Sequence, residues 1–232
     1  MKQPKVIFLD AVGTVFGVKG NVGEVYSYLA SQVGVICPAE KLETAFYKQF
    51  KTSPPLAFPG VDVMAVSDLE YQWWYQVAYD TYREAEVMDQ FADFDSFFNQ
   101  LYDYFATPDP WFLYTDVFPA LKHWQKQGIA LGIISNFDSR IYEVLDIFGL
   151  TNFFETITIS STTGTAKPHS NIFREALEKH QCRPEEAWHI GDSKREDYEG
   201  AKAVGINPFL LDRDDNKPRA DYTIINSMEM LI

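Results

Sequence analysis

The chain of 232 residues has only two cysteines, Cys37 and Cys182, and four histidines. Two thiols are too few for a disulfide framework or a zinc site, and they suit a reducing compartment. Long apolar runs are also missing. The first apolar segment ends at Asp10, and no run reaches the length of a membrane-spanning helix. These absences predict a soluble, cytoplasmic protein that has neither a signal peptide nor a membrane partner.

Positive charge is scarce as well. Twenty lysines and arginines face 33 aspartates and glutamates, which gives a net charge of −13 and a pI near 4.7. Such a surface repels phosphate backbones and anionic lipids, so nucleic acid is not expected as a partner. A small anion can still bind where a local lysine or a metal ion offsets the charge.

Apolar strand-like runs alternate with helix-period segments after residue 111. The expected strands are 129–134, 156–159, 187–190, 208–211 and 222–225, with one more at 6–9. The expected helices between them are 116–128, 138–149, 170–182 and 196–205. Continuous apolar strands separated by helices predict an α/β fold, a Rossmann-like parallel sheet covered on both faces.

The region from about residue 20 to 108 shows helical periods and no convincing strand. Its expected helices are 24–33, 39–51, 67–85 and 88–106. An aromatic cluster over 71–82 can form a substrate-facing wall or the core of a helical bundle, and we favour the core. We therefore predict a catalytic core formed by 1–18 and 109–232, with an inserted α-helical cap at 19–108.

Polar residues follow the predicted strands, and in parallel α/β sheets ligands bind at the carboxyl ends of the strands. Asp10 follows the first strand, and Ser135-Asn136 follows the strand 129–134. Lys167 lies a little beyond the next strand, and Gly191-Asp192-Ser193 follows 187–190. Each group alone can be a turn or a helix cap. Together, in this order, they suit a site for a phosphoryl group.

These residues resemble the four motifs of the haloacid dehalogenase superfamily. The matching segments are Asp10-x-x-Gly13-Thr14, Ser135-Asn136, Lys167-Pro168 and Gly191-Asp192-Ser193-x-x-x-Asp197 with Gly200-Ala201. The helical insert lies where members with an α-helical cap carry theirs. Ser135-Asn136-Phe137-Asp138, together with Trp73-Trp74, further resembles the subgroup related to the rhythmically expressed gene 2 product.

The resemblance implies a hydrolase that uses Mg²⁺ and acts on a small phosphorylated substrate. Asp10 is then the nucleophile that forms an aspartyl-phosphate, and Lys167 and Ser135 assist it. The implied Mg²⁺ ligands are Asp10, the Val12 carbonyl and Asp192, with Asp197 as a further ligand or an anchor behind them. The substrate contacts are expected from the backbone after Asp10 and from the second motif: Ala11, Val12, Thr14 and Asn136.

Val12 departs from the family pattern, because most of its phosphatases carry a second aspartate there that protonates the leaving alcohol. Dehalogenases of the family also lack that aspartate, since halide needs no proton, so a metal-independent 2-haloacid dehalogenase is one alternative. Asp192 and Asp197 argue for the metal-dependent form. Another alternative is a pseudo-phosphatase that binds a phosphorylated ligand or a partner without turnover.

Two residues near the motifs are candidates for the missing proton donor. Asp138 can serve as an acid or as a helix N-cap, and His169 as an acid or as a solvated loop residue; we favour the structural role for both. His189, within a predicted strand, is interpreted as a core histidine.

Overall fold

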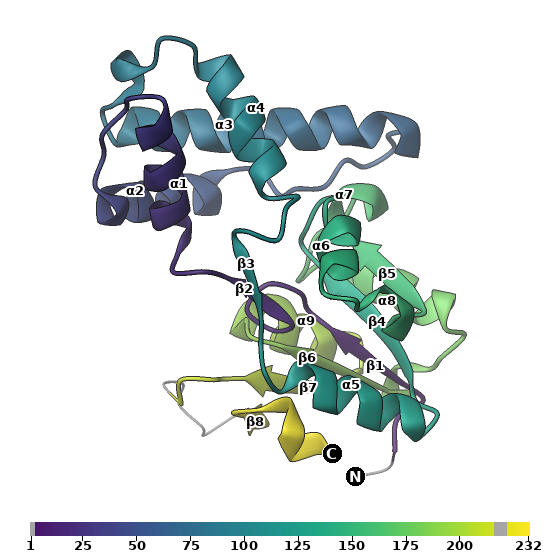
Figure 1. The fold of residues 1–232 in the computed structure, drawn as a ribbon. Coiled ribbons are helices and arrows are strands. Elements are labelled where there is room, and N and C mark those ends of the chain that lie inside the picture. The colour runs from purple at the N-terminus through teal and green to yellow at the C-terminus, as the bar shows by residue number, and fades with distance from the viewer. Residues whose placement is uncertain (1–2, 216–221) are drawn as a thin grey trace. The chain divides into compact units, whose positions relative to one another are not determined.

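The computed structural model describes residues 3–215 and 222–232, which divide into two compact units (Figure 1). The described residues of Met1–Gly17, Leu56–Val61 and Leu113–Ile232 form unit 1. Unit 2 comprises Val18–Pro55 and Asp62–Phe112. Residues 56–61, which lie inside the range predicted for the insert, therefore pack with unit 1.

Unit 1 is built on a six-stranded sheet whose strand pairings are parallel. Its strands are β1 (Val6–Leu9), β4 (Ala130–Ser135), β5 (Thr156–Ile159), β6 (Ala187–Gly191), β7 (Asn207–Leu211) and β8 (Ile224–Ile225). Their order across the sheet is β5-β4-β1-β6-β7-β8, which confirms the predicted α/β, Rossmann-like class. A separate pair, β2 (Phe16–Val18) and β3 (Trp111–Leu113), was not predicted, because three residues carry too little periodic signal.

Helices lie on both faces of this sheet (Figure 1). The α-helices of unit 1 are α5 (Val117–Lys126), α6 (Ile141–Ile147), α7 (Ser160–Thr163), α8 (Ser170–Lys179) and α9 (Gly200–Ala203). Its 3₁₀ turns are η3 (Thr151–Phe153), η4 (Pro184–Glu186) and η6 (Met228–Leu231). One face packs Val6, Phe8 and Ile134 against α8 and α9. Right-handed crossovers in this strand order place α5 and α6 on the opposite face.

The single helix predicted over 196–205 is wrong. A π-helix, η5 (Lys194–Glu199), comes first and leads directly into the short α9. The Ser193 carbonyl accepts hydrogen bonds from the N–H groups of Asp197 and Tyr198, both at 3.1 Å, and the bond from Tyr198 closes the wider π-turn. The Ser193 side chain caps the start of this segment by accepting from the Glu196 N–H at 3.2 Å. The cap explains why the helical segment starts before residue 196.

Unit 2 is mainly helical, and no strand occurs between residues 19 and 108, all of which are described. Its helices are α1 (Val22–Gln32), α2 (Ala39–Thr52), η1 (Val63–Ala65), α3 (Val66–Glu84), η2 (Met88–Gln90) and α4 (Phe94–Tyr104). The helix predicted over 88–106 is broken, because the Asp93 side chain caps a new start by accepting from the Ser96 N–H. None of the helices in the described ranges is long and apolar enough to cross a membrane.

The aromatic cluster forms part of the unit 2 core, as predicted. Tyr82 is fully buried, stacks on Tyr26 with 5.7 Å between ring centroids, and donates its hydroxyl proton to the Tyr26 carbonyl. Trp73 and Trp74 are half-buried against this core. Stacked and edge-on aromatic pairs add stability beyond the area they bury, so the cluster holds the bundle together.

A buried ion pair connects distant parts of unit 1. Both oxygens of Asp116 accept from the Arg213 guanidinium, at 2.9 and 3.0 Å, and one oxygen also accepts from the Met228 N–H at 2.8 Å. Arg213 donates as well to the Thr14 carbonyl at 2.8 Å and lies 3.8 Å from the centre of the Tyr114 ring. One aspartate thus ties the start of α5 to the C-terminal segment and, through Arg213, to the loop after β1.

We expect Asp116→Asn to lower the free energy of unfolding by about 3 kcal/mol, because it leaves a largely buried guanidinium without its anionic partner. Urea denaturation monitored by circular dichroism measures this loss. The control is Glu175→Gln, which breaks the exposed pair between Glu175 and Lys179 and should cost less than about 0.5 kcal/mol. Equal losses in the two variants would contradict a special role for Asp116.

Candidate active site

Asp10 follows β1, Ser135 ends β4, and Lys167 lies in the loop between α7 and α8; the structure brings the three into direct contact. Asp10 Oδ1 accepts from Ser135 Oγ at 3.0 Å and from Lys167 Nζ at 2.6 Å. All three side chains are buried. β1 and β4 are neighbours in the sheet, so Ser135 meets Asp10 across 125 positions, and the loop after α7 brings Lys167 to Asp10 across 157. The three residues predicted to be catalytic therefore form one cluster.

The Lys167 ammonium has an acceptor for each of its three protons. Besides Asp10, Nζ donates to Asp197 Oδ1 at 2.6 Å and to the Ile134 carbonyl at 2.9 Å. Burial alone would lower the pKa of Lys167, but the charges of Asp10 and Asp197 outweigh burial and raise that pKa above its ordinary value. The lysine is therefore a fixed positive charge between two carboxylates.

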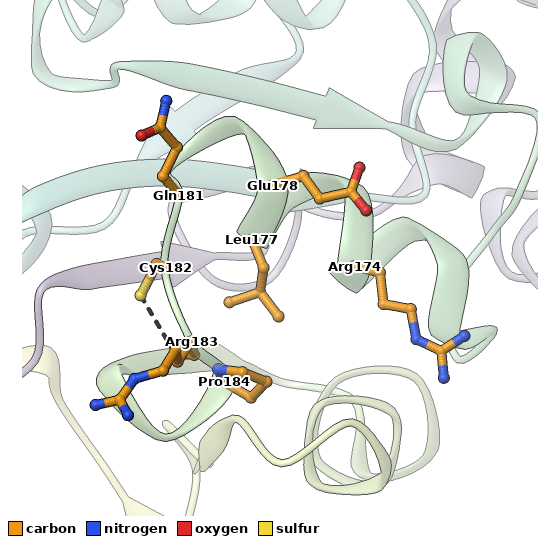
Figure 2. A pocket seen from close by; sticks show the side chains of 7 residues that line it. All are labelled: Arg174, Leu177, Glu178, Gln181, Cys182, Arg183 and Pro184. Carbon is orange, nitrogen blue, oxygen red and sulfur yellow. Dashed lines mark hydrogen bonds between the residues drawn. The ribbon is translucent and has the colours of Figure 1, made fainter.

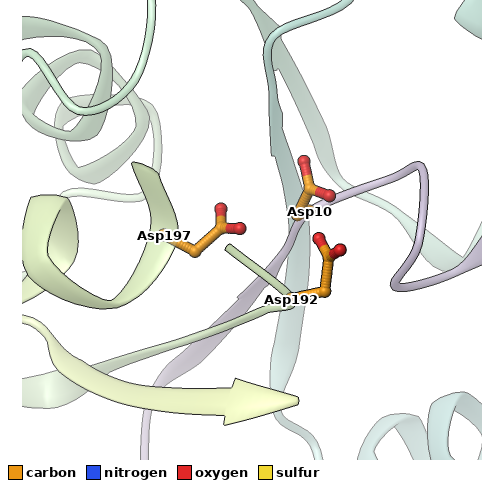
Figure 3. Close-up of side chains that lie close together, drawn as sticks. All are labelled: Asp10, Asp192 and Asp197. Atoms are coloured by element: carbon orange, nitrogen blue, oxygen red, sulfur yellow. The ribbon is translucent and has the colours of Figure 1, made fainter. Parts of the chain in front are cut away.

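The carboxylates of Asp10, Asp192 and Asp197 converge (Figure 3), and Lys167 contacts the first and the last of them. Oxygens of Asp10, Asp192 and Asp197 lie within 4.8 Å of one another, and Asp197 reaches toward the other two from η5. Burial raises the pKa of Asp10 above its ordinary value, although Lys167 opposes the shift. Such a cluster of hard oxygen donors fits the ligand chemistry of Mg²⁺.

Asp197 differs from the other two carboxylates in its partners. Oδ1 accepts from Lys167 and lies 2.9 Å from His189 Nε2, and Oδ2 accepts from the Ser193 N–H at 2.9 Å. Burial works against its charge, but Lys167 and His189 together lower the pKa of Asp197 well below the usual range. With both oxygens engaged by protein donors, Asp197 fits an anchoring role better than direct coordination of a cation.

Two glycines give the acidic side chains their space. A Cβ atom on Gly191 would overlap Cγ of Asp197, and one on Gly13 would lie 2.7 Å from Oδ2 of Asp192. Gly13 also has a backbone φ of +84°, a value that residues with a Cβ atom rarely adopt. The motif glycines are therefore required by close approach to the carboxylates.

The loop after Asp10 makes a tight turn. The Ala11 carbonyl accepts from the N–H groups of Thr14, Val15 and Phe16 at 2.7–3.2 Å. The Thr14 N–H, predicted to face a substrate, is thus engaged within the loop, and its fully buried hydroxyl has no partner among the described residues. Ala11 is buried and Val12 is half-buried beside Asp10. The N–H groups of Ala11 and Val12 are not among the donors of this turn.

Asn136, also predicted to contact substrate, contacts the main chain of Lys167. Its Oδ1 accepts from the Lys167 N–H at 2.7 Å, and its Nδ2 donates to the Lys167 carbonyl at 3.0 Å. Nδ2 also lies 3.3 Å from a carboxylate oxygen of Glu196. The amide therefore clamps the backbone that carries the site lysine. Sequence proximity to Ser135 indicated the location of Asn136 but could not show this partner.

The other residues considered from the sequence fall into different places. Asp138 is fully buried and accepts from the Arg140 side chain on both oxygens and from the Arg140 N–H, which favours the structural role. His169 is exposed and caps α8 by accepting from the Asn171 N–H. His189 is a core residue, as predicted, but its hydrogen bond to Asp197 also connects it to the site, which the sequence analysis missed. Residues two apart in a strand lie on the same face, so the position of His189 two residues before Gly191 in β6 was the feature of the sequence that pointed to the site.

A hollow in unit 1, with a volume of about 470 Å³, lies at the C-terminal end of α8 (Figure 2). Leu177, Cys182 and Arg183 are among its lining residues, and none of the predicted site residues lines it. Arg183 pairs with Glu185 and Glu186, and the Cys182 thiol donates to the Arg183 carbonyl at 3.3 Å. Arg183 and Cys182 therefore bond within the local turn.

Comparison with known proteins finds a family model and relatives that match most of the chain. The family model described as haloacid dehalogenase-like hydrolase matches residues 4–205. The haloacid dehalogenase-like hydrolase domain-containing protein 3 of Mus musculus is 33% identical over 209 residues, which are 90% of this chain and 82% of the relative. The rhythmically expressed gene 2 protein of Drosophila melanogaster is 26% identical over 218 residues, 89% of this chain and 82% of its own length.

Solved structures with the same fold include both kinds of enzyme considered above. A predicted phosphoglycolate phosphatase from Haemophilus somnus has a TM-score of 0.70 at 21% identity, covering 100% of this chain and 97% of its own. A 2-haloacid dehalogenase from Pseudomonas syringae has a TM-score of 0.67 at 19% identity, covering 99% and 96%. At these identities the likeness establishes the fold alone.

The clamp predicts that Asn136→Ala destabilises the protein by about 2 kcal/mol, since it leaves a donor and an acceptor of the Lys167 backbone without partners. Chemical denaturation measures this loss. Asn171→Ala is the control, because that residue is exposed and should cost less than about 0.5 kcal/mol. If the two variants were equally stable and only Asn136→Ala weakened the binding of inorganic phosphate, Asn136 would be a substrate contact instead.

Proposed function

The chain belongs to the haloacid dehalogenase-like hydrolase family, and on this premise we propose that it is a Mg²⁺-dependent phosphatase of small phosphorylated substrates. The observation that carries the proposal is the sharing of the Lys167 ammonium between Asp10 and Asp197, next to Asp192. This arrangement combines a buried nucleophile, a fixed cation and a set of oxygen donors, the three elements that phosphoryl transfer needs.

In the proposed reaction, a carboxylate oxygen of Asp10 attacks phosphorus and forms an aspartyl-phosphate. The bond from phosphorus to the leaving oxygen breaks, and its electron pair stays on that oxygen. Lys167 offsets negative charge on the phosphoryl group, while Ser135 and the backbone at Ala11 and Val12 hold its oxygens. Water then attacks the aspartyl-phosphate, which releases inorganic phosphate and restores Asp10.

Asp10, Asp192 and the Val12 carbonyl are the residues that would hold Mg²⁺, with Asp197 behind them. When bound, the ion reduces the repulsion between the nucleophile and the anionic substrate. The contacts of Asp197 with Lys167, His189 and Ser193 support the anchoring role in this proposal. Two carboxylates and a carbonyl are hard donors of the kind this ion prefers.

Val12 determines which substrates suit the site. No carboxyl side chain occupies the position two residues after Asp10, so the leaving group must depart as an anion or take its proton from water. Phenols and acyl groups are stable anions, whereas alkyl alcohols are not. We therefore propose aryl or acyl phosphates as the favoured substrate class.

We expect hydrolysis of an aryl phosphate such as 4-nitrophenyl phosphate to require Mg²⁺ and to be lost in Asp10→Asn. The amide of the variant cannot act as the nucleophile, and it is a poorer partner for Lys167. Release of nitrophenol, followed by absorbance with Mg²⁺ and with excess chelator, measures both effects.

The alternatives have their own outcomes in the same assay. Release of halide from a 2-haloacid in excess chelator would identify a dehalogenase. Binding of inorganic phosphate without turnover of phosphate esters or of 2-haloacids would identify a phosphate-binding protein without catalysis. Full phosphatase activity in chelator would remove the metal ion from the mechanism.

We expect Val12→Asp to increase kcat on an alkyl phosphate, by up to the factor of about 10²–10⁴ that a general acid provides. The gain on an aryl phosphate should be smaller, because its leaving group needs less help. Steady-state kinetics of both enzymes on one substrate of each class measure the difference. Val12→Asn is the control, because it places a polar side chain of the same size without an acidic proton and should bring no gain. A wild-type enzyme that cleaves both classes equally well would show that another group supplies the proton.

A further inference from the structure

His189 is a polar side chain in the most buried part of the sheet. It lies in β6, has no exposed surface, and meets the ring of Phe173 edge-on with 5.4 Å between centroids. Its Nε2 lies 2.9 Å from Asp197 Oδ1, whereas Nδ1 is buried without a hydrogen-bond partner among the described residues. An unpartnered buried nitrogen costs free energy, so a histidine here needs a compensating contact.

The direction of the hydrogen bond follows from the chemistry of its partners. The carboxylate of Asp197 offers only acceptors, so Nε2 must carry the proton and donate. The same oxygen accepts from Lys167, and the other oxygen accepts from the Ser193 N–H. Asp197 is thus fixed by donors from β6, from the start of η5 and from the lysine.

The lysine contact makes this bond relevant to the reaction. Lys167 Nζ is 2.6 Å from an oxygen of Asp10 and 2.6 Å from an oxygen of Asp197. Any movement of Asp197 changes the balance between these two contacts. If the donor at residue 189 is lost, Oδ1 keeps only the lysine as a partner, and the ammonium is drawn toward Asp197 and away from Asp10.

We propose that His189 is a positioning residue, which holds Asp197 where that carboxylate and Asp10 share the Lys167 ammonium. The inference rests on the proposed function, because it assigns His189 to the same reaction. His189 contacts no reacting atom and acts only through Asp197. Its removal should therefore lower kcat more than it changes KM, since the misplaced charge matters most when negative charge develops on the phosphoryl group.

The test compares His189→Leu with His189→Gln. Leucine fills the space without a donor, whereas the glutamine amide can donate at about the reach of Nε2. We expect His189→Leu to lower kcat on an aryl phosphate by about 10- to 100-fold, the usual range for partners behind a functional residue. His189→Gln should recover most of that loss.

His180 offers a matched control for the loss of a buried histidine. Its side chain is 5% exposed, it lies 2.7 Å from Thr156 Oγ1, and it meets the ring of Phe8 edge-on at 5.3 Å. His180 lies at the C-terminal end of α8, and His180→Leu removes a hydrogen bond and a ring contact that this histidine makes to residues of the same sheet. We expect it to lower stability while kcat stays near that of the wild type. Equal losses of kcat in His180→Leu and His189→Leu would overturn the proposal.

Crystal structures of the variants test the inference without any substrate. Lys167 Nζ should stay within hydrogen-bonding distance of Asp10 in His189→Gln and leave it in His189→Leu; an unchanged contact in His189→Leu would overturn the proposal. If that variant does not fold, His189→Asn replaces it, because its shorter amide cannot reach Asp197. A wild-type protein that cleaves no phosphate ester would contradict the proposed function, and the position of Lys167 would still decide the role of His189.

Discussion

The sharing of one buried ammonium between two carboxylates is the constraint on which the site depends. Lys167 keeps its charge inside the protein, so each proton of its ammonium needs an acceptor. The acceptors are Asp10 at the end of β1, the Ile134 carbonyl in β4 and Asp197 in η5. Asn136 fixes the lysine backbone and His189 fixes Asp197, so the supporting contacts extend from this one ion pair network into the sheet. These contacts leave the site, at the carboxyl ends of the strands, little freedom to rearrange.

Much of this arrangement could be predicted from the sequence, for a physical reason. Strands β1 and β5 match their predicted bounds, because a buried parallel strand is a short continuous apolar run. Asp10, Ser135 and Lys167 could be expected together, because parallel strands end at a common edge. The parallel sheet and the helices between residues 19 and 108 followed from the same periodicities.

The parts that could not be predicted depend on contacts between residues distant in sequence. Asn136 beside Ser135 looks like a substrate contact until the backbone of Lys167 is found at its amide. A histidine in an apolar strand is expected to be a core residue, and His189 is one. Its Nε2 atom nevertheless contacts Asp197, which the strand pattern does not reveal. The three-residue strands β2 and β3 form by pairing with each other, and this pairing cannot be predicted from the local sequence of either strand.

The π-helix η5 has a consequence for how this chain is aligned with others. A π-turn accommodates one more residue than an α-turn while the segments on either side keep their places, so it absorbs a single-residue insertion. In a homologue with an α-turn here, the place that Asp197 holds would be occupied by the residue four positions after the aspartate that corresponds to Asp192. Counting without a gap from Asp192 would then assign that role to Glu196. Alignments through this segment should therefore be anchored on the carboxylate that contacts the lysine, with the gap placed between residues 193 and 197.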